Sequence, residues 1–250
     1  MPGFQGKTAL VTGAASGIGA ACVEWLAARG IGRFILVDID ATGLESLAPD
    51  CERIACAGDV ADPALWEHVA ERCDGLDLAV LNAGIAASGG IIDLDFAQWR
   101  RVMATNLDGM VLSLRGAMRA MRQNGGSVVL TASASGIKAE PGTAAYGASK
   151  AGVIQLAKVA AKEGAPLGIR VNAVAPGGVD TPIWDDVPMF ADMAARQGRD
   201  AAIASMGSMA TPLGRFARRE EIAAQIGFLL SDDAATITGS VLVTDGGYSL

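Results

Sequence analysis

The sequence has few aromatic residues, a single histidine and no excess of positive charge. In 250 residues the aromatic share is 5%, and 20 lysines and arginines stand against 27 aspartates and glutamates, for a formal net charge of −7. Because a polyphosphate backbone is bound by clustered cations, this balance disfavours nucleic acid as a partner. One histidine, His68, and four cysteines without metal-ligand spacing do not make a zinc site. We therefore expect no metal.

Long apolar runs are also missing. No stretch approaches the roughly 20 apolar residues of a membrane span. The apolar run at residues 8–12 is too short for a secretory signal segment. The cysteines are then interpreted as thiols kept in a reducing compartment. We expect a soluble, cytoplasmic protein without a membrane partner.

Glycine and aliphatic residues are abundant, and the 32 glycines suit tight turns and close packing of helices on a sheet. Short apolar runs alternate with helical patterns along the whole chain, which predicts a parallel sheet covered on both sides. The fold class expected is α/β, a single-domain Rossmann-type doubly wound parallel sheet with helices on both faces, over residues 1–250. Strands are expected at 7–12, 34–37, 53–57, 76–81, 127–131, 169–173 and 240–243, and helices at 17–29, 41–47, 63–73, 96–122, 144–163 and 219–230.

Residues 179–215 form the one long segment without a regular pattern, and its length predicts a substrate lid. Its apolar side chains either face a hydrophobic or cyclic alcohol or ketone, or pack the lid onto the core or onto another subunit. The sequence leaves both interpretations open. These side chains are Trp184, Val187, Met189, Phe190, Met193, Met206 and Met209.

A glycine-rich loop follows the first predicted strand and runs directly into a helix. It reads Gly13-Ala14-Ala15-Ser16-Gly17-Ile18-Gly19, and its glycines allow backbone amides to approach a pyrophosphate at a helix N-terminus. The spacing Gly-x-x-x-Gly-x-Gly differs from the general dinucleotide fingerprint. Its position between a strand and a helix still indicates dinucleotide binding.

Asp38 ends the second predicted strand, nineteen residues after Gly19. A carboxylate at this point can accept hydrogen bonds from the adenosine ribose and would repel a 2′-phosphate. The glycine loop contains no lysine or arginine, and Arg33 lies at the far end of the same strand. The sequence therefore favours NAD over NADP.

Tyr146 and Lys150 lie four residues apart at the start of a predicted helix, with Ser133 thirteen residues before Tyr146. Positions i and i+4 share one face of a helix, so the ammonium can lie beneath the phenol. Lowering the phenol pKa from about 10 towards neutrality needs roughly 3–4 kcal/mol, which a close cation can supply. A phenol, an ammonium and a hydroxyl in this pattern favour proton exchange with a carbinol oxygen. Alone, the short Tyr-x-x-x-Lys pattern favours an exposed tyrosine and a solvated lysine on a helix surface.

Taken together, these motifs resemble the short-chain dehydrogenase/reductase family over the whole chain. The resemblance implies that Asn106, Ser133, Tyr146 and Lys150 form a catalytic tetrad, with Tyr146 as the general acid/base and Asn106 holding a water that links Lys150 to solvent. From the sequence alone, Asn106 also fits a helical polar residue bonded to nearby backbone. Leu81 departs from the family, which often has Asn at that position.

The resemblance also implies which further residues surround the NAD cofactor. It implies that Asp59 and Val60 lie beside the adenine, that Asn82-Ala83-Gly84 forms the turn after the fourth strand, and that the segment from Pro176 grips the nicotinamide amide. The full set is Gly13, Ser16, Gly17, Ile18, Gly19, Asp38, Asp59, Val60, Asn82, Ala83, Gly84, Tyr146, Lys150, Pro176, Gly177, Val179 and Thr181.

We thus expect an NAD-dependent enzyme that transfers hydride between the nicotinamide and a small-molecule secondary alcohol or ketone, hydrophobic or cyclic. The alternative is an NADPH-dependent 3-oxoacyl-thioester (acyl-carrier-protein) reductase, against which Asp38 and the acidic balance argue. A non-catalytic nicotinamide sensor would carry a degraded tetrad, and this tetrad is intact. The resemblance further implies a homotetramer.

Overall fold

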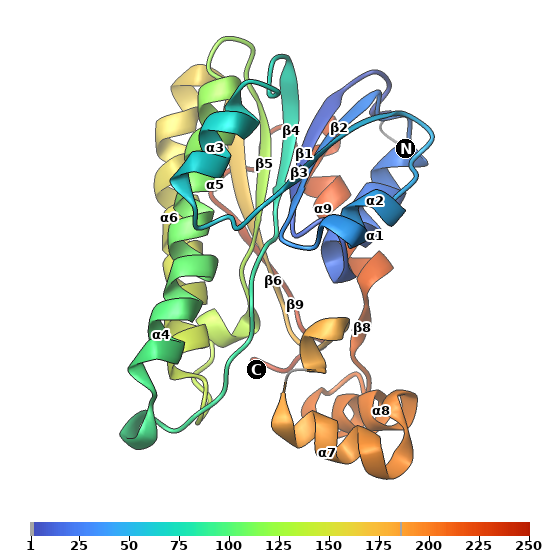
Figure 1. Ribbon diagram of the computed structural model, residues 1–250, viewed down its shortest axis with the longest axis vertical. Coiled ribbons are helices and arrows are strands. Elements are labelled where there is room, and N and C mark those ends of the chain that lie inside the picture. The colour runs from blue at the N-terminus through green and yellow to red at the C-terminus, as the bar shows by residue number, and fades with distance from the viewer. Residues whose placement is uncertain (1–2, 186) are drawn as a thin grey trace.

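Seven parallel strands form the centre of the structure (Figure 1), a computed structural model that describes residues 3–185 and 187–250. Their order is β3-β2-β1-β4-β5-β6-β9. The predicted fold class is confirmed, and the predicted strands agree with the observed ones to within a few residues. The strands are β1 (Thr8–Thr12), β2 (Arg33–Asp38), β3 (Glu52–Ala57), β4 (Leu76–Leu81), β5 (Gly126–Thr131), β6 (Ile169–Pro176) and β9 (Val241–Thr244).

The strand order reverses at β1, which pairs with β2 on one side and with β4 on the other. Thr12, the last residue of β1, lies opposite Val37 of β2 and Leu81 of β4. The residues that follow each strand, Asp38 and Asn82 among them, therefore leave the sheet at the same level. In open α/β sheets this edge, beyond the carboxyl ends of the strands, is where ligands bind.

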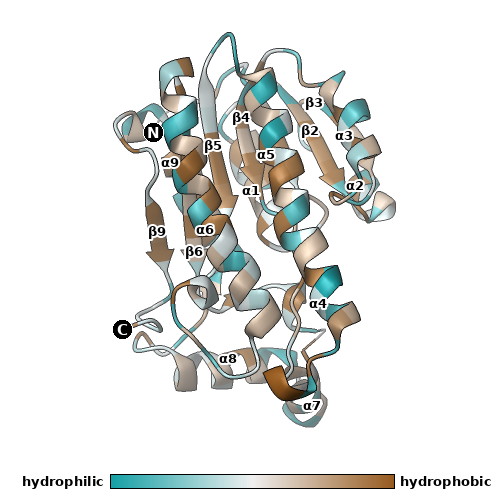
Figure 2. Ribbon diagram, turned by 90° about the vertical axis from the view of Figure 1, so that its left-hand side faces the viewer, coloured by the Kyte–Doolittle hydropathy of each residue, from teal (hydrophilic) through white to brown (hydrophobic). Residues whose placement is uncertain are grey.

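Helices cover both faces of the sheet. One apolar cluster packs α3, α5 and α6 against it, and a second packs α1, α2 and α9 against the other face. In Figure 2, teal bands recur along α5, as expected for a half-exposed helix, while the edge strand β9 is brown although its residues are only partly buried. The helices are α1 (Gly17–Ala27), α2 (Ala41–Ser46), α3 (Pro63–Ala70), α4 (Phe96–Met103), α5 (Gly109–Ala120), α6 (Ala144–Gly164) and α9 (Arg219–Leu230).

The prediction of one continuous α-helix over 96–122 is wrong in the middle of that range. α4 and α5 are separated by a π-helical segment, Ala104–Asp108, in which the amide of Gly109 bonds to the carbonyl of Ala104. Two contacts favour the wider turn. The side-chain amide of Asn106 bonds to Ile85 in a neighbouring loop, and a Cβ at Gly109 would come within 2.7 Å of Val60 Cγ2. Such segments are rare and occur mostly at functional sites.

The segment 179–215 is more regular than predicted. After β7 (Val179–Asp180) and a 3-10 turn, it forms α7 (Pro188–Gln197) and α8 (Arg199–Ala210), and β7 pairs in parallel with β8 (Ala217–Arg218). Gly198 separates the two helices with a φ of 86°, a conformation that glycine adopts readily. Figure 1 shows α7 and α8 beyond the carboxyl ends of β6 and β9.

Most of the apolar side chains of this segment pack on one another. Phe190, Met206 and Phe216 are buried together, with Trp184 stacked on Phe216 at 5.2 Å between ring centres. Val187 and Met193 pack against the same cluster. Met189 and Met209 are instead exposed. Five of the seven side chains thus pack in a cluster of their own, an arrangement that neither of the two interpretations described.

None of the helices in the described ranges, 3–185 and 187–250, is both long enough and apolar enough to cross a membrane.

The packing of α9 on α1 fixes the helix that carries the glycine loop, and it gives a first prediction. A Cβ at Gly227 would overlap the indole of Trp25, whose ring is held by the Arg29 guanidinium at 3.6 Å and by Phe4 at 5.9 Å. We expect Gly227→Ala to lower the free energy of unfolding by about 1–3 kcal/mol, measured by urea denaturation. Gly90→Ala is the matched control, because nothing lies within 4 Å of its Cβ position. Equal stability of the two variants would contradict tight packing of α9 on α1.

Candidate active site

The glycine loop presents bare backbone at the start of α1. Gly13 and Gly17 have φ values of 64° and 53°, and a Cβ at Gly19 would overlap the carbonyl oxygen of Gly13. Ser16 gives α1 no side-chain cap, and the first turn has no acidic residue. The first amides of a helix lack intrahelical acceptors and carry partial positive charge. The loop therefore fits the pyrophosphate of a dinucleotide.

The turn after β4 is fastened to this loop. The hydroxyl oxygen of Thr12 accepts hydrogen bonds from the amides of Asn82 at 2.9 Å and Ala83 at 3.2 Å. The side-chain amide of Asn82 donates to the carbonyl of Gly13 at 3.3 Å. A Cβ at Gly13 would lie 2.9 Å from the Cα of Ala83, so the two backbones are in close contact.

Asp38 lies beside the glycine loop. One carboxylate oxygen accepts from the amide of Ala15 at 2.9 Å and the other from the amide of Asp40 at 3.0 Å. The carboxylate is thus fixed in orientation at the end of β2, while the next side chain, Ile39, is exposed. A negative group held at this point fits a ribose diol better than a phosphate ester.

The other residues predicted beside the adenine lie at the end of β3. The amide of Gly58 donates to the carbonyl of Asp38 at 2.9 Å, which places the two strand ends together. The Asp59 carboxylate accepts from the amide of Ala61 at 2.9 Å. The carbonyl of Val60 accepts from the buried Trp66 indole at 2.8 Å.

The segment after β6 borders the same loop. Pro176 ends β6, and the amide of Gly177 bonds to Thr244 in β9 at 3.2 Å. Thr181 is buried, and a Cβ at Gly17 would lie 3.4 Å from the Cβ and Cγ2 of Thr181. The structure thus brings the predicted nicotinamide segment against the predicted pyrophosphate loop.

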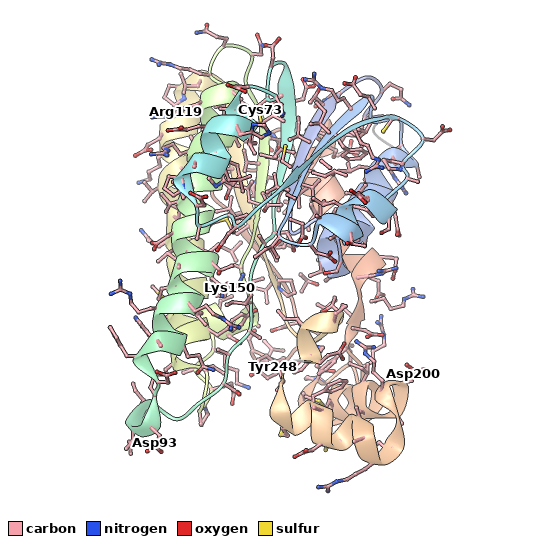
Figure 3. All side chains as sticks on the ribbon, in the orientation of Figure 1. Cys73, Asp93, Arg119, Lys150, Asp200 and Tyr248 are labelled. Atoms are coloured by element: carbon pink, nitrogen blue, oxygen red, sulfur yellow. The ribbon has the colours of Figure 1, made fainter. Side chains whose placement is uncertain are left out.

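The four predicted catalytic residues come from three elements and lie at the same end of the sheet. Ser133 follows β5, and Tyr146 and Lys150 lie in the first two turns of α6. The Lys150 ammonium is buried, donates to the carbonyl of Thr131 at 2.9 Å and lies 5.7 Å from the ring centre of Tyr146. Figure 3 shows Lys150 between the sheet and α4. The predicted sharing of one helix face is confirmed.

Asn106 is fully buried in the π-helical segment. Its side-chain oxygen accepts from the amide of Ile85 at 2.8 Å, and its nitrogen donates to the carbonyl of Ile85 at 3.0 Å and to the hydroxyl of Ser149 at 3.2 Å. Ser149 in turn donates to the carbonyl of Tyr146 at 2.7 Å. Asn106 therefore does bond to backbone, but to a distant loop rather than to its own helix, and it links that loop to α6.

The protonation equilibria differ from the sequence-based expectation. Burial raises the pKa of the Tyr146 phenol, and a side-chain hydrogen bond with Ser133 opposes this rise only in part. Burial also lowers the pKa of Lys150 to about 8. The predicted depression of the phenol pKa by Lys150 is therefore wrong for the protein by itself. The ammonium points at the carbonyl of Thr131, and removal from water outweighs its attraction on the phenol.

The loop after Ser133 carries a further polar cluster. Lys138 pairs with Glu140 at 3.2 Å and donates to the carbonyl of Tyr248 at 2.9 Å. Its ammonium lies 4.2 Å from the Tyr248 ring centre. A hydrogen bond with Glu140, added to burial, raises the pKa of the Tyr248 phenol to about 12. The cluster fastens the segment after β9 to the loop that carries Ser133.

Sequence reasoning missed the partners that hold these groups. Thr12 acts through its hydroxyl at a strand end, and Ser149 lies three residues after Tyr146, so a polar residue at either position was a usable signal. Thr131 accepts through its backbone carbonyl and gives no such signal. Ile85 acts through its backbone and gives no signal in the sequence. Within the described residues, no group of three or more His, Cys, Asp or Glu side chains could hold a metal ion.

Comparison with known proteins agrees with this geometry. The family profile described as enoyl-(acyl carrier protein) reductase matches residues 13–249. The cis-4-hydroxycyclohexanecarboxylate dehydrogenase of Sinomonas cyclohexanicum is 40% identical over 262 residues, and the 3-oxoacyl-(acyl-carrier-protein) reductase of Thermotoga maritima is 37% identical over 254 residues; each match covers 98% of both chains. A solved short-chain type dehydrogenase/reductase from Mycobacterium marinum aligns with a TM-score of 0.88 at 31% identity, over 99% of this chain and 97% of that one.

The chain is a short-chain dehydrogenase/reductase. It is accordingly an oxidoreductase of a family that uses a nicotinamide cofactor.

The buried Lys150 gives a prediction for stability against pH. Its pKa is about 8 in the folded protein and 10.5 in the absence of burial. Between these values the unfolded chain binds more protons than the folded one, so the free energy of unfolding increases as pH rises from 8 to 10.5. The gain is lost when pH is lowered through 8. We expect the wild type to gain about 2 kcal/mol relative to Lys150→Met between about pH 7.5 and 9.5, measured by urea denaturation at each pH. Parallel curves would show that the ammonium does not titrate in this range.

Proposed function

We propose that this short-chain dehydrogenase/reductase transfers hydride between NAD and a hydrophobic or cyclic secondary alcohol or its ketone. The proposal rests above all on one juxtaposition. A half-buried phenol, a buried ammonium and a buried hydroxyl lie at the same edge of the sheet as the glycine loop, which has a fixed carboxylate beside it. The first set handles a substrate oxygen, and the second receives a dinucleotide.

The chain's own residues divide the work on the substrate. Tyr146 exchanges a proton with the substrate oxygen, and Ser133 donates a hydrogen bond to that oxygen as charge develops on it. Lys150 lies beneath Tyr146, and Asn106 holds the first turns of α6 through Ser149. When bound, the nicotinamide supplies the hydride chemistry.

The raised pKa of Tyr146 bears on the direction of proton transfer. At neutral pH burial keeps the phenol protonated, which suits donation of a proton to a ketone oxygen. Oxidation of an alcohol needs the phenolate, so alkaline pH favours that direction. The oxidative rate is therefore the one that rises with pH.

The choice of substrate class is supported by a relative and by the lid. A relative that is 40% identical is named for a ring alcohol, 4-hydroxycyclohexanecarboxylate. The apolar side chains around Phe190 pack on one another, so the lid is a preformed element and not a loose loop. Apolar walls with a few directed polar groups are typical of small-molecule sites.

A second candidate is reduction of a 3-oxoacyl thioester on an acyl carrier protein with NADPH. It is favoured by the Thermotoga maritima relative, whose name states that activity, at 37% identity over nearly the whole chain. The fixed carboxylate of Asp38 argues against it, because this charge would repel a 2′-phosphate.

Removal of the Tyr146 hydroxyl tests the catalytic assignment. We expect Tyr146→Phe to lower kcat for cyclohexanol and for cis-4-hydroxycyclohexanecarboxylate by about 10³-fold, since the proton has no other acceptor. NADH affinity, measured by fluorescence titration, should stay within about threefold, because the glycine loop is untouched. Tyr248→Phe alters the other of the two tyrosines and should keep its activity. A Tyr146→Phe enzyme with normal turnover would remove Tyr146 from the mechanism.

Removal of the Asp38 charge tests the cofactor. We expect the wild type to bind NADH at least about tenfold more tightly than NADPH, and Asp38→Asn to lose about tenfold of that preference, or about 1.4 kcal/mol. Asp40→Asn removes a neighbouring charge, keeps an acceptor for the amide of Gly43, and should leave the preference unchanged. A wild type that prefers NADPH would overturn the NAD assignment and make the thioester reductase the leading candidate.

A further inference from the structure

Arg199 connects two parts of the structure that are separate in the sequence. It is the first residue of α8, and its guanidinium donates to the carboxylate of Asp180 at 2.7 Å, to the carbonyl of Thr181 at 3.0 Å and to the carboxylate of Asp185 at 3.2 Å. It also lies 5.9 Å from the ring centre of Phe190. One side chain thus makes four contacts with residues that precede α8.

Two of these contacts are to residues at the start of the segment 179–215, and two are to residues just before and within α7. Asp180 and Thr181 belong to β7 and the residue after it, and Thr181 borders the glycine loop at Gly17. Asp185 follows the 3-10 turn that opens the lid, and Phe190 is the buried aromatic residue of α7. A displacement of α7 and α8 therefore acts on Thr181 through this guanidinium, alongside the hydrogen bonds of Trp184 to Thr181 and Val179.

The chemistry of this junction requires arginine. The planar guanidinium offers five donors in fixed directions and here serves two carboxylates and one carbonyl at once. A lysine ammonium carries the same charge but has no fixed fork of donors. Without a cation, the carboxylates of Asp180 and Asp185 would share a small region with only repulsion between them.

The same junction contributes little to overall stability. The Arg199 side chain is 36% exposed, and those of Asp180 and Asp185 are 44% and 54% exposed. Ion pairs with this much solvent around them contribute between zero and about 1 kcal/mol. Its main effect is to fix directions between two segments, which separates a positioning role from a structural one.

We propose that Arg199 is a positioning residue that couples the lid to the cofactor site. The coupling rests on the assignment of Thr181 to the nicotinamide under the proposed function. Binding at the Thr181 segment orders α7 and α8 through Arg199, and an ordered lid in turn holds Thr181 in place. Because coupling between two sites is reciprocal, loss of Arg199 weakens both effects.

Hydrogen–deuterium exchange of the full chain, with and without NADH, reports the coupling independently of activity. In the wild type we expect NADH to slow exchange both at residues 13–19 and at residues 188–210. In Arg199→Met, NADH should still protect residues 13–19, should lose most of its protection of 188–210, and should bind about five- to tenfold more weakly. Arg199→Lys should lie between the two. Arg196→Met, at an exposed position in the last turn of α7, is the matched control and should behave as wild type.

A second variant guards against a folding defect in the first. Asp185→Asn removes the lid-side charge and leaves the donation to Thr181 intact, so it should lose part of the lid protection with an unchanged melting temperature. Full lid protection in both Arg199→Met and Asp185→Asn, or no lid protection in the wild type with either cofactor, would overturn the coupling. If NADPH rather than NADH protects residues 13–19, the NAD assignment fails, and the coupling is decided by the lid peptides measured with NADPH.

Discussion

The close contact between the end of β1 and the end of β4 is the constraint on which the rest of the site depends. β1 lies where the strand order reverses, so its carboxyl end has a neighbour on each side and an open edge above. The hydroxyl oxygen of Thr12 accepts hydrogen bonds from two backbone amides of the turn after β4. This clamp brings Gly13 against Ala83, and a side chain larger than hydrogen at position 13 has no room. Packing thus requires glycine at positions 13 and 19, and a φ of 53° favours it at position 17, before any ligand is considered.

From this clamp a chain of buried hydrogen bonds leads to the reacting groups. The loop after Gly84 is held by the amide of Asn106, which also reaches Ser149 and, through it, the carbonyl of Tyr146. Each buried polar group in this chain has a partner, as burial demands. The cost of the dry environment falls on the two titratable groups, whose pKa values move in opposite directions: the phenol upwards and the ammonium downwards. Both shifts favour the uncharged form, so the phenol of the protein by itself stays protonated at neutral pH.

Sequence patterns predicted the sheet, its covering helices and the residues at its ligand edge, because these depend on local periodicity and on glycine spacing. The strands around Thr12 and Asp38 are apolar runs with clear ends, and Tyr146 and Lys150 need only the 3.6-residue repeat to share a face. The π-helical turn at Asn106 was not predictable, since its cause is a loop some twenty residues away in the chain. Arg199 was missed for the same reason: its partners lie 14 to 19 residues before it. The sign of the Tyr146 shift depends on burial, which a sequence pattern does not measure.

The π-helical segment also constrains how this chain can change by insertion and deletion. A residue added to an α-helix turns everything beyond it by about 100°. The segment Ala104–Asp108 therefore sets α4 and α5 out of phase with one another while keeping them coaxial. Loss of one residue here would restore a regular helix without disturbing the hydrophobic pattern of either half. It would nevertheless rotate Asn106 away from Ile85 and uncouple the loop after β4 from α6. Within this helix the contacts of Asn106 depend on the number of residues and not only on their identity.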